Sequence, residues 1–134
     1  MTIVLDTNVL VSALLNPHGI PAKVLRAVLV GRVQLAYDFR ILSEYREVLR
    51  RPKFPFGDDQ IGTLLDLFEK EGVCVTAAPL GRALPDTDDA PFLEVAVAGK
   101  VDALVTGNPR HFPEDVTAPV AVLSPRELLA RLRV

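Results

Sequence analysis

The stretch Thr2-Ile3-Val4-Leu5-Asp6-Thr7-Asn8-Val9-Leu10 decides the fold, because an apolar run near the start of the chain ends abruptly in Asp-Thr-Asn. The continuous apolar residues from Ile3 to Leu5 are typical of a strand that is buried on both faces of a parallel sheet. In open α/β sheets, ligands bind beyond the carboxyl ends of the strands. We therefore expect Asp6 to stand at the edge of the sheet where a binding site forms.

Length and composition limit what the rest of the chain can be. The 134 residues predict a single domain over residues 1–134 with one sizeable core. No apolar run approaches the ~20 residues of a membrane-spanning helix, and the start lacks a signal-peptide pattern, so we expect a cytoplasmic protein without a membrane segment. The single cysteine, Cys74, lies between two valines, and we expect a buried core thiol. The net charge of −2 argues against binding nucleic acid by bulk charge alone, but it does not exclude a nuclease.

Apolar spacing and turn residues divide the chain into alternating strands and helices. Strands are expected at residues 3–5, 33–37, 73–76, 103–106 and 120–123. Helices are expected at residues 7–15, 21–30, 39–50, 58–71, 92–99 and from 125 onward, with loops at 77–91 and 107–113. Asp38 is expected to cap the helix that follows it. This alternation implies right-handed crossovers and an α/β fold with a mostly parallel, five-stranded sheet covered by helices on both faces.

Acidic and amide side chains collect at the predicted carboxyl edge of this sheet. Asp6 ends the first strand, Glu44 lies in the helix after the second, and Asn108 follows the fourth. The loop before helix 92–99 adds Asp86, Asp88 and Asp89. Carboxylates in a partly dry cleft repel one another unless a cation is present, and oxygen ligands without a Cys or His cluster favour Mg²⁺ or Mn²⁺.

A site of this kind predicts a reaction class. A divalent cation polarises a phosphoryl oxygen and activates water for in-line attack, so phosphodiester hydrolysis is the expected reaction. Thr7, Asn8 and Thr106 stand beside the predicted ligands, and we expect them to hydrogen-bond the carboxylates or water around the cation.

Each of these residues also has a purely structural interpretation. Asp6, Asp88 and Asp89 occupy positions at which helix N-caps are common. A helical glutamate such as Glu44 is most often a solvated charge, and we expect Glu94 to be exposed. By the same reasoning Asn108 is a turn residue and His111 is an exposed loop histidine.

Four segments together resemble the PIN-domain family in order and spacing. They are Val4-Leu5-Asp6-Thr7-Asn8-Val9-Leu10-Val11-Ser12-Ala13, Ser43-Glu44-Tyr45-Arg46-Glu47-Val48-Leu49, Asp86-Thr87-Asp88-Asp89-Ala90-Pro91-Phe92-Leu93 and Leu104-Val105-Thr106-Gly107-Asn108-Pro109-Arg110-His111-Phe112-Pro113. More narrowly, the chain is similar to family members that act as toxins in toxin-antitoxin systems. The resemblance extends over essentially the whole chain. It implies a three-layer α/β/α fold and a ribonuclease that uses Mg²⁺ or Mn²⁺ in a pocket lined by acids.

The resemblance also assigns roles to individual positions. It implies that Asp6, Glu44 and Asp89 are the catalytic and metal-binding acids, with Asp88 and Asp86 as alternates to Asp89. Many relatives carry further acids where this chain has Asn108 and His111. An amide oxygen brings no charge, so Asn108 is expected to make a weaker second metal position.

The predicted partners are RNA, an antitoxin and a second copy of the chain. We expect RNA phosphates to contact basic residues near the Glu44 helix, namely Arg40, Arg46, Arg50, Arg51 and Lys53, together with His111. We expect Phe54, Phe56 or Tyr45 to stack on a base. The structural alternative is that the basic residues form a solvated helix face and that the aromatic residue is buried. The toxin interpretation implies a small antitoxin that occludes the pocket, and a homodimer. A housekeeping RNA-processing nuclease and a catalytically silent binding module are the alternative functions.

Overall fold

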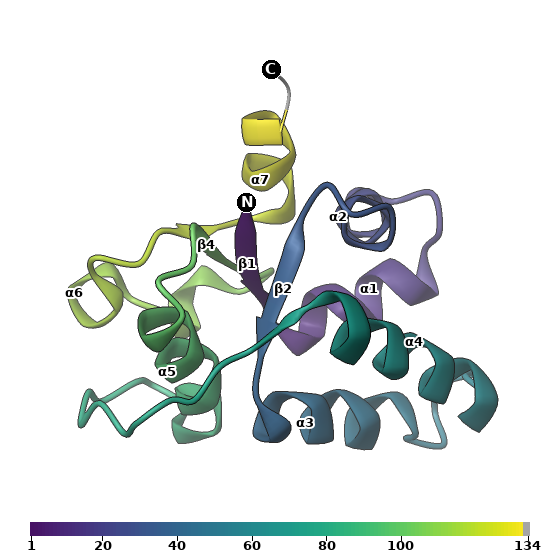
Figure 1. Cartoon of the computed structure of the whole chain (residues 1–134), viewed down its shortest axis with the longest axis horizontal. Coiled ribbons are helices and arrows are strands. Elements are labelled where there is room, and N and C mark those ends of the chain that lie inside the picture. Colours follow the sequence, from purple (N-terminus) through teal and green to yellow (C-terminus); the bar gives the residue numbers. More distant parts are fainter. Residues whose placement is uncertain (133–134) are drawn as a thin grey trace.

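A computed structural model describes residues 1–132 as an alternation of strands and helices (Figure 1). The strands are β1 (Thr2–Leu5), β2 (Gln34–Tyr37), β3 (Val73–Cys74), β4 (Ala103–Val105) and β5 (Val122–Leu123). The helices are α1 (Thr7–Leu15), α2 (Ile20–Leu29), α3 (Phe39–Leu49), α4 (Asp58–Glu71), α5 (Ala90–Ala98), α6 (Glu114–Thr117) and α7 (Pro125–Leu132). Short 3₁₀ turns, η1 (Thr87–Asp89) and η2 (Pro109–His111), precede α5 and α6.

The strands form a five-stranded sheet in the order β3-β2-β1-β4-β5, and every neighbouring pair is parallel. β1 is the central strand, with Ile3 paired to Leu35 on one side and to Ala103 on the other. The expected five-stranded parallel sheet is therefore confirmed. Because all strands run the same way, the residues that follow them meet at one edge.

Helices cover both faces of the sheet. The connections from β1 to β2 and from β3 to β4 run in opposite directions along the sheet, so right-handed crossovers carry their helices to opposite faces. α5 contacts β1, β2 and β4, while α2 packs against α1 and α7. These layers make the expected three-layer α/β/α fold.

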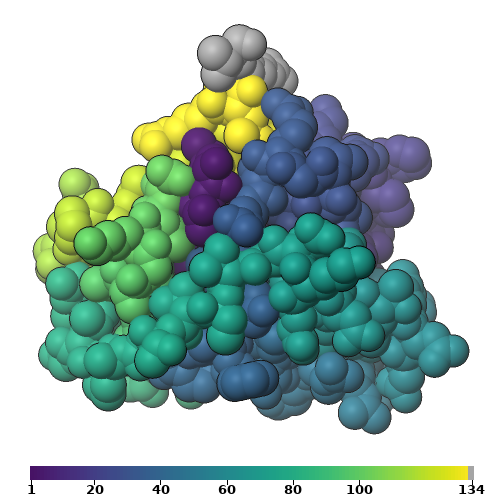
Figure 2. Space-filling view, in the orientation of Figure 1, coloured from purple at the N-terminus to yellow at the C-terminus, as the bar shows by residue number. Residues whose placement is uncertain are grey.

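The core is built around β1, whose Ile3, Val4 and Leu5 are fully buried. α3 is attached to the end of this strand, because the buried Tyr45 hydroxyl donates a hydrogen bond to the Leu5 carbonyl. The Tyr45 ring packs edge-on against Phe68 of α4. In Figure 2, α4 and the segment after it (teal) cover much of β2 on one face of the molecule.

The structure corrects several expectations at the periphery. β3 and β5 each have two residues, shorter than predicted, and α6 lies where no element was expected. A four-residue helix is too short to create a helical apolar period, which explains why the sequence did not reveal it. The prediction of a buried Cys74 is wrong: its side chain is exposed, because β3 is the edge strand of the sheet. Within residues 1–132, no helix is long and apolar enough to cross a membrane.

Candidate acidic site

Asp6 and Thr106 follow the neighbouring strands β1 and β4 and meet at the carboxyl edge of the sheet. The chain leaves β1 toward β2 and later returns to β4 on the other side, so this is the point where ligands bind in open α/β sheets. Thr106 Oγ1 donates a hydrogen bond of 2.8 Å to Asp6 Oδ2, and the Asn108 N–H donates one of 3.0 Å to Thr106 Oγ1. Asp6 occupies the N-cap position of α1, but within the described residues its carboxylate makes no capping hydrogen bond. The carboxylate is therefore available for another role.

The surroundings of Asp6 disfavour its charge. The residue is 6 % exposed, and burial raises its pKa above the ordinary value. The hydrogen bond from Thr106 opposes this rise without cancelling it. A cation close to the carboxylate would lower the pKa again.

Glu44 reaches the same edge from α3. Thr7 Oγ1, in the first turn of α1, donates a hydrogen bond to Glu44 Oε2. Burial is the main cause that raises the pKa of Glu44, and the charges of Asp6 and Asp88 add to it. Glu44 is thus not the solvated helix charge of the structural interpretation.

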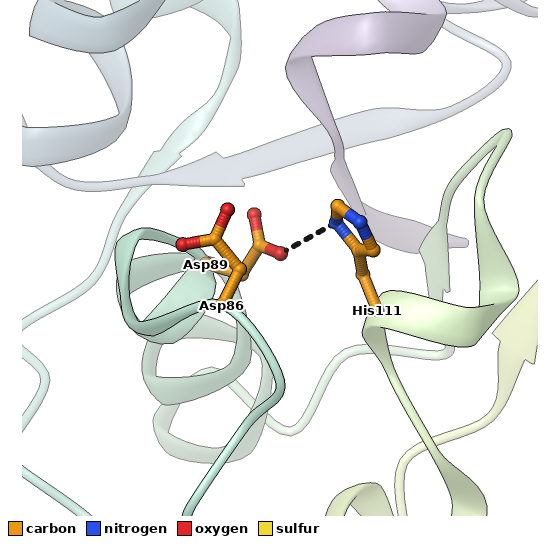
Figure 3. A group of neighbouring side chains, drawn as sticks. All are labelled: Asp86, Asp89 and His111. Carbon is orange, nitrogen blue, oxygen red and sulfur yellow. Dashed lines mark ion pairs between the residues drawn. The ribbon is translucent and has the colours of Figure 1, made fainter.

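Asp86, Asp89 and His111 form the tightest cluster of the site (Figure 3). One ligand atom from each of the three lies within 4.8 Å of the others. Asp86 caps η1 by accepting a hydrogen bond of 2.9 Å from the Asp88 N–H. His111, in the turn after β4, brings Nδ1 to 2.9 Å from Asp89 Oδ2.

Asp89 has the most strongly raised pKa among the carboxyl groups of the site. Its side chain is 13 % exposed, and its pKa is raised to about 6, first by burial and then by the charge of Asp6, with His111 opposing. Oδ2 is buried and, among residues 1–132, has no partner with hydrogen-bond geometry, although His111 Nδ1 lies 2.9 Å away. A buried carboxylate oxygen without a hydrogen bond, next to other carboxylates, fits a divalent cation.

The chain matches the model of the PIN domain over residues 2–110. It belongs to the PIN-domain family. A relative of this PIN domain, uncharacterized protein MJ1680 of Methanocaldococcus jannaschii, is 30 % identical over 109 residues, which cover 79 % of this chain and 70 % of that protein.

Two solved structures share the fold of this PIN domain. A chain of VapBC2 from Rickettsia felis, bound to a DNA fragment from its promoter, aligns with a TM-score of 0.63 and 18 % identity, covering 92 % of this chain and 98 % of that one. A chain of FitAB, bound to an IR36 DNA fragment, aligns with a TM-score of 0.59 and 19 % identity, covering 92 % and 94 %.

The structure brings the predicted acids of this PIN domain to one edge, but with a different centre. Asp6 interacts electrostatically with Glu44 and with Asp89, while the closest group is Asp86, Asp89 and His111. His111, which we expected either as an RNA contact or as an exposed loop residue, contacts the Asp89 carboxylate while its side chain is 40 % exposed, and an RNA contact stays a prediction. The resemblance to the family contained one signal, because it implies an acid at the position of His111.

The supporting residues behave largely as expected. Thr7 and Thr106 donate hydrogen bonds to carboxylates, as predicted. Asn8 does not bond a carboxylate in this way: its Oδ1 accepts a hydrogen bond of 3.2 Å from the Gly107 N–H and thereby fixes the turn that leads to Asn108.

The structure revises the predicted RNA-binding residues. Tyr45 is buried and unable to stack on a base, so for this residue the alternative of a buried aromatic is confirmed. Arg40 bridges Asp38 at 2.7 Å and Glu94 at 2.6 Å, which corrects the expected exposure of Glu94. Asp38 caps α3 as predicted.

The remaining basic residues lie along α3 and its exit. Arg46 and Arg51 are exposed, and Arg50 pairs with Asp58 at 3.2 Å. Lys53 Nζ lies 5.1 Å from the centre of the Phe54 ring, which stacks on Phe56. Their contact with RNA stays a prediction.

A separate hollow of about 630 Å³ lies near the amino ends of β1 and β2. Residues 28–35 of the α2–β2 connection line it together with Met1, Phe68 and Glu71. This lining contains a single carboxylate, so it lacks the convergent acids found at the opposite edge. We therefore place the functional site at the acidic edge.

Proposed function

We propose that this PIN domain is a metal-dependent endoribonuclease, with Asp6, Glu44 and Asp89 as its catalytic acids. The observation that carries the proposal is that these carboxyl groups lie at one edge of the sheet and all have raised pKa values. Three acids from three distant segments meet at one edge, and the pKa of each is raised primarily by burial. Such an arrangement is typical of a functional site, and membership of the family supports a nuclease.

The residues that would hold Mg²⁺ or Mn²⁺ are Asp6 and Asp89, with Glu44 and Asn108 at the rim. When bound, the cation polarises a phosphoryl oxygen and activates the attacking water. The chain itself supplies orientation: Thr106 holds Asp6, and Thr7 holds Glu44. Asn108 is positioned through its own N–H on Thr106 and contributes an uncharged oxygen.

The proposed substrate is RNA, with phosphates held by exposed Arg46 and Arg51 beside the Glu44 helix. We further propose that residues 1–134, of which the last two lie outside the described part, form one domain that works in the cytoplasm.

The proposed partners are a small antitoxin and a second copy of the chain. The structural neighbours VapBC2 and FitAB are two-component complexes bound to DNA, which supports a protein partner of this kind. For the homodimer, the end of α2 is one candidate interface, because Leu29 and Val30 are 41 % and 70 % exposed.

The deciding experiment measures cleavage of single-stranded RNA in Mg²⁺, in Mn²⁺ and in EDTA. We expect the unmodified protein to cleave only with a divalent cation, and Asp6→Asn to lose cleavage while its circular dichroism spectrum is unchanged. Asp66→Asn, at an exposed position on α4, is the matched control and should cleave normally. Equal cleavage by Asp6→Asn and the unmodified protein would reject the proposal.

The toxin role is tested separately in growing cells. Expression of the unmodified protein should arrest growth, and expression of Asp6→Asn should not. RNA cleavage without growth arrest would favour a housekeeping nuclease, the alternative with the same chemistry. Metal binding without cleavage of RNA would favour a silent binding module.

A further inference from the structure

The contact between His111 and Asp89 suggests which cation the acidic site takes. The chain has two histidines, and His111 alone belongs to the cluster with Asp86 and Asp89. Figure 3 shows the ion pair of Asp89 with His111 and places Asp86 beside Asp89, and one ligand atom from each of the three lies within 4.8 Å of the others. The inference about the cation rests on the proposed function, because it concerns the metal of the same site.

The turn that carries His111 is fixed by its neighbours. The His111 N–H donates a hydrogen bond of 3.1 Å to the Asn108 carbonyl, and the next residue, Phe112, is 2 % exposed. The imidazole is therefore anchored between the end of β4 and the core. Its own side chain is 40 % exposed, which leaves a route for a cation from solvent.

The distances suit a shared ligand set. Neighbouring ligands of an octahedral ion at ~2.1 Å lie ~3 Å apart, and opposite ligands lie ~4.2 Å apart. The 2.9 Å between His111 Nδ1 and Asp89 Oδ2 fits the first value, and the three-atom cluster, which stays within 4.8 Å, would have to contract by at most ~0.6 Å around an ion. Asp89 Oδ2 is also buried and, in the described chain, has no hydrogen bond of its own.

We propose that His111 Nδ1 and Asp86 join Asp89 as ligands of the metal assigned above to Asp6 and Asp89, and that the nitrogen makes the site prefer a first-row transition ion over Mg²⁺. An imidazole nitrogen is a normal ligand for transition ions, whereas Mg²⁺ favours oxygen and keeps its waters. The nitrogen occupies the position at which an all-oxygen site would carry another carboxylate. Mn²⁺ is the probe ion, because it is paramagnetic and is the member of the series closest to Mg²⁺ in hardness.

The test records pulsed electron paramagnetic resonance of Mn²⁺ bound to the full chain. We expect ¹⁴N modulation from an imidazole in the unmodified protein and in His18→Asn, which removes the other, exposed histidine. The modulation should disappear in His111→Asn. Loss of the modulation in His18→Asn, or its absence in the unmodified protein with Mn²⁺ bound, would overturn the proposal and leave the nuclease function standing.

Calorimetric titration with Mn²⁺ and with Mg²⁺ gives a second measurement. His111→Asp should lower the ratio of the Mg²⁺ to the Mn²⁺ dissociation constant by about tenfold, since it replaces nitrogen with a hard oxygen. An unchanged ratio would contradict the proposal. Failure to bind either ion, together with no RNA cleavage, would reject both this ligand assignment and the proposed function.

Discussion

Asp89 has a buried carboxylate, two acidic neighbours and no hydrogen bond to Oδ2 within the described residues. We expect Asp89→Asn to lower Mn²⁺ affinity by at least about tenfold, because a charged ligand becomes neutral. Without metal, the same variant should melt at a higher temperature at pH 8, because repulsion from Asp6 and Asp86 is relieved. Calorimetry and thermal unfolding measure the two effects.

Asp66→Asn is the control for this pair of measurements, because Asp66 is an exposed acid in the middle of α4. Its Mn²⁺ affinity should match that of the unmodified protein. If Asp89→Asn melts at a lower temperature without metal, the Asp89 carboxylate stabilises the metal-free fold, which would contradict its assignment as a strained metal ligand.

The raised pKa of Asp89, about 6 against an ordinary value of 3.8, also predicts a pH dependence. Between these values the folded protein binds a proton that the unfolded chain has released, so the stability of the metal-free protein should fall as pH rises from 4 to 6. With saturating Mn²⁺ the trend should reverse, because the cation binds the deprotonated carboxylate.

Melting temperatures at pH 4.5, 5.5 and 7 with and without Mn²⁺ test this prediction. Asp89→Asn isolates the contribution of this group, since the background titration of other acids is common to both proteins. A difference between the two proteins that does not vary with pH would show that Asp89 titrates normally.

At the scale of elements, Arg40 joins α3, which carries Glu44, to α5, which begins directly after Asp89. It lies on α3, and its guanidinium contacts Glu94 of α5 as well as Asp38. We expect Arg40→Gln and Glu94→Gln each to weaken Mn²⁺ binding severalfold while changing stability by less than about 1 kcal/mol, because Arg40 is 46 % exposed.

A charge exchange tests whether the pair acts by positioning. Arg40→Glu combined with Glu94→Arg should recover Mn²⁺ affinity better than either single reversal. The exposed pair of Arg50 and Asp58 provides the control, and its removal should leave Mn²⁺ binding unchanged. Additive losses in the double variant would mean that the two charges act independently.

The Tyr45 hydroxyl links α3 to β1. Its removal should lower the stability of the fold and weaken metal binding. We expect Tyr45→Phe to lower the free energy of unfolding by about 1–2 kcal/mol, because a buried hydrogen bond to the Leu5 carbonyl disappears. Tyr37→Phe removes a partly exposed bond of 3.0 Å to the Glu69 carbonyl and should cost less. Urea denaturation compares the two, and an equal loss would contradict the assigned role.

The elements that could be predicted are those with a strong pattern of their own. The apolar run of β1 at residues 3–5 and the periodic α2, α3 and α4 could be predicted because burial sets their composition. The lengths of β3 and β5 were overestimated, because the extent of a two-residue edge strand depends more on its pairing with the neighbouring strand than on its own sequence. Cys74 was placed in the core because apolar valines flank it, whereas an edge strand exposes its side chains to solvent.

At the scale of the whole molecule, the sequence was enough to place the acids at one edge, because parallel strands all end there. Which oxygens meet depends on side-chain direction and on the path of loops, and neither leaves a periodic signal. For this reason Asp86 and His111 were ranked behind Asp6, although the structure gathers them around Asp89. The sequence also could not decide whether Tyr45 is buried, since an aromatic residue beside arginines fits a surface as well as a core.

The hydrogen bond between Thr106 and Asp6 joins residues that are 100 positions apart. It has a consequence for protein synthesis. A ribosome makes β1 before β4, so a nascent chain whose residues 103–111 are still inside the ribosome lacks Thr106, Asn108 and His111 beside Asp6. Early β1–β2 pairing can form without them. The acidic edge therefore closes only after residues 103–111 have left the ribosome, so the site is assembled later than the part of the sheet that holds Asp6.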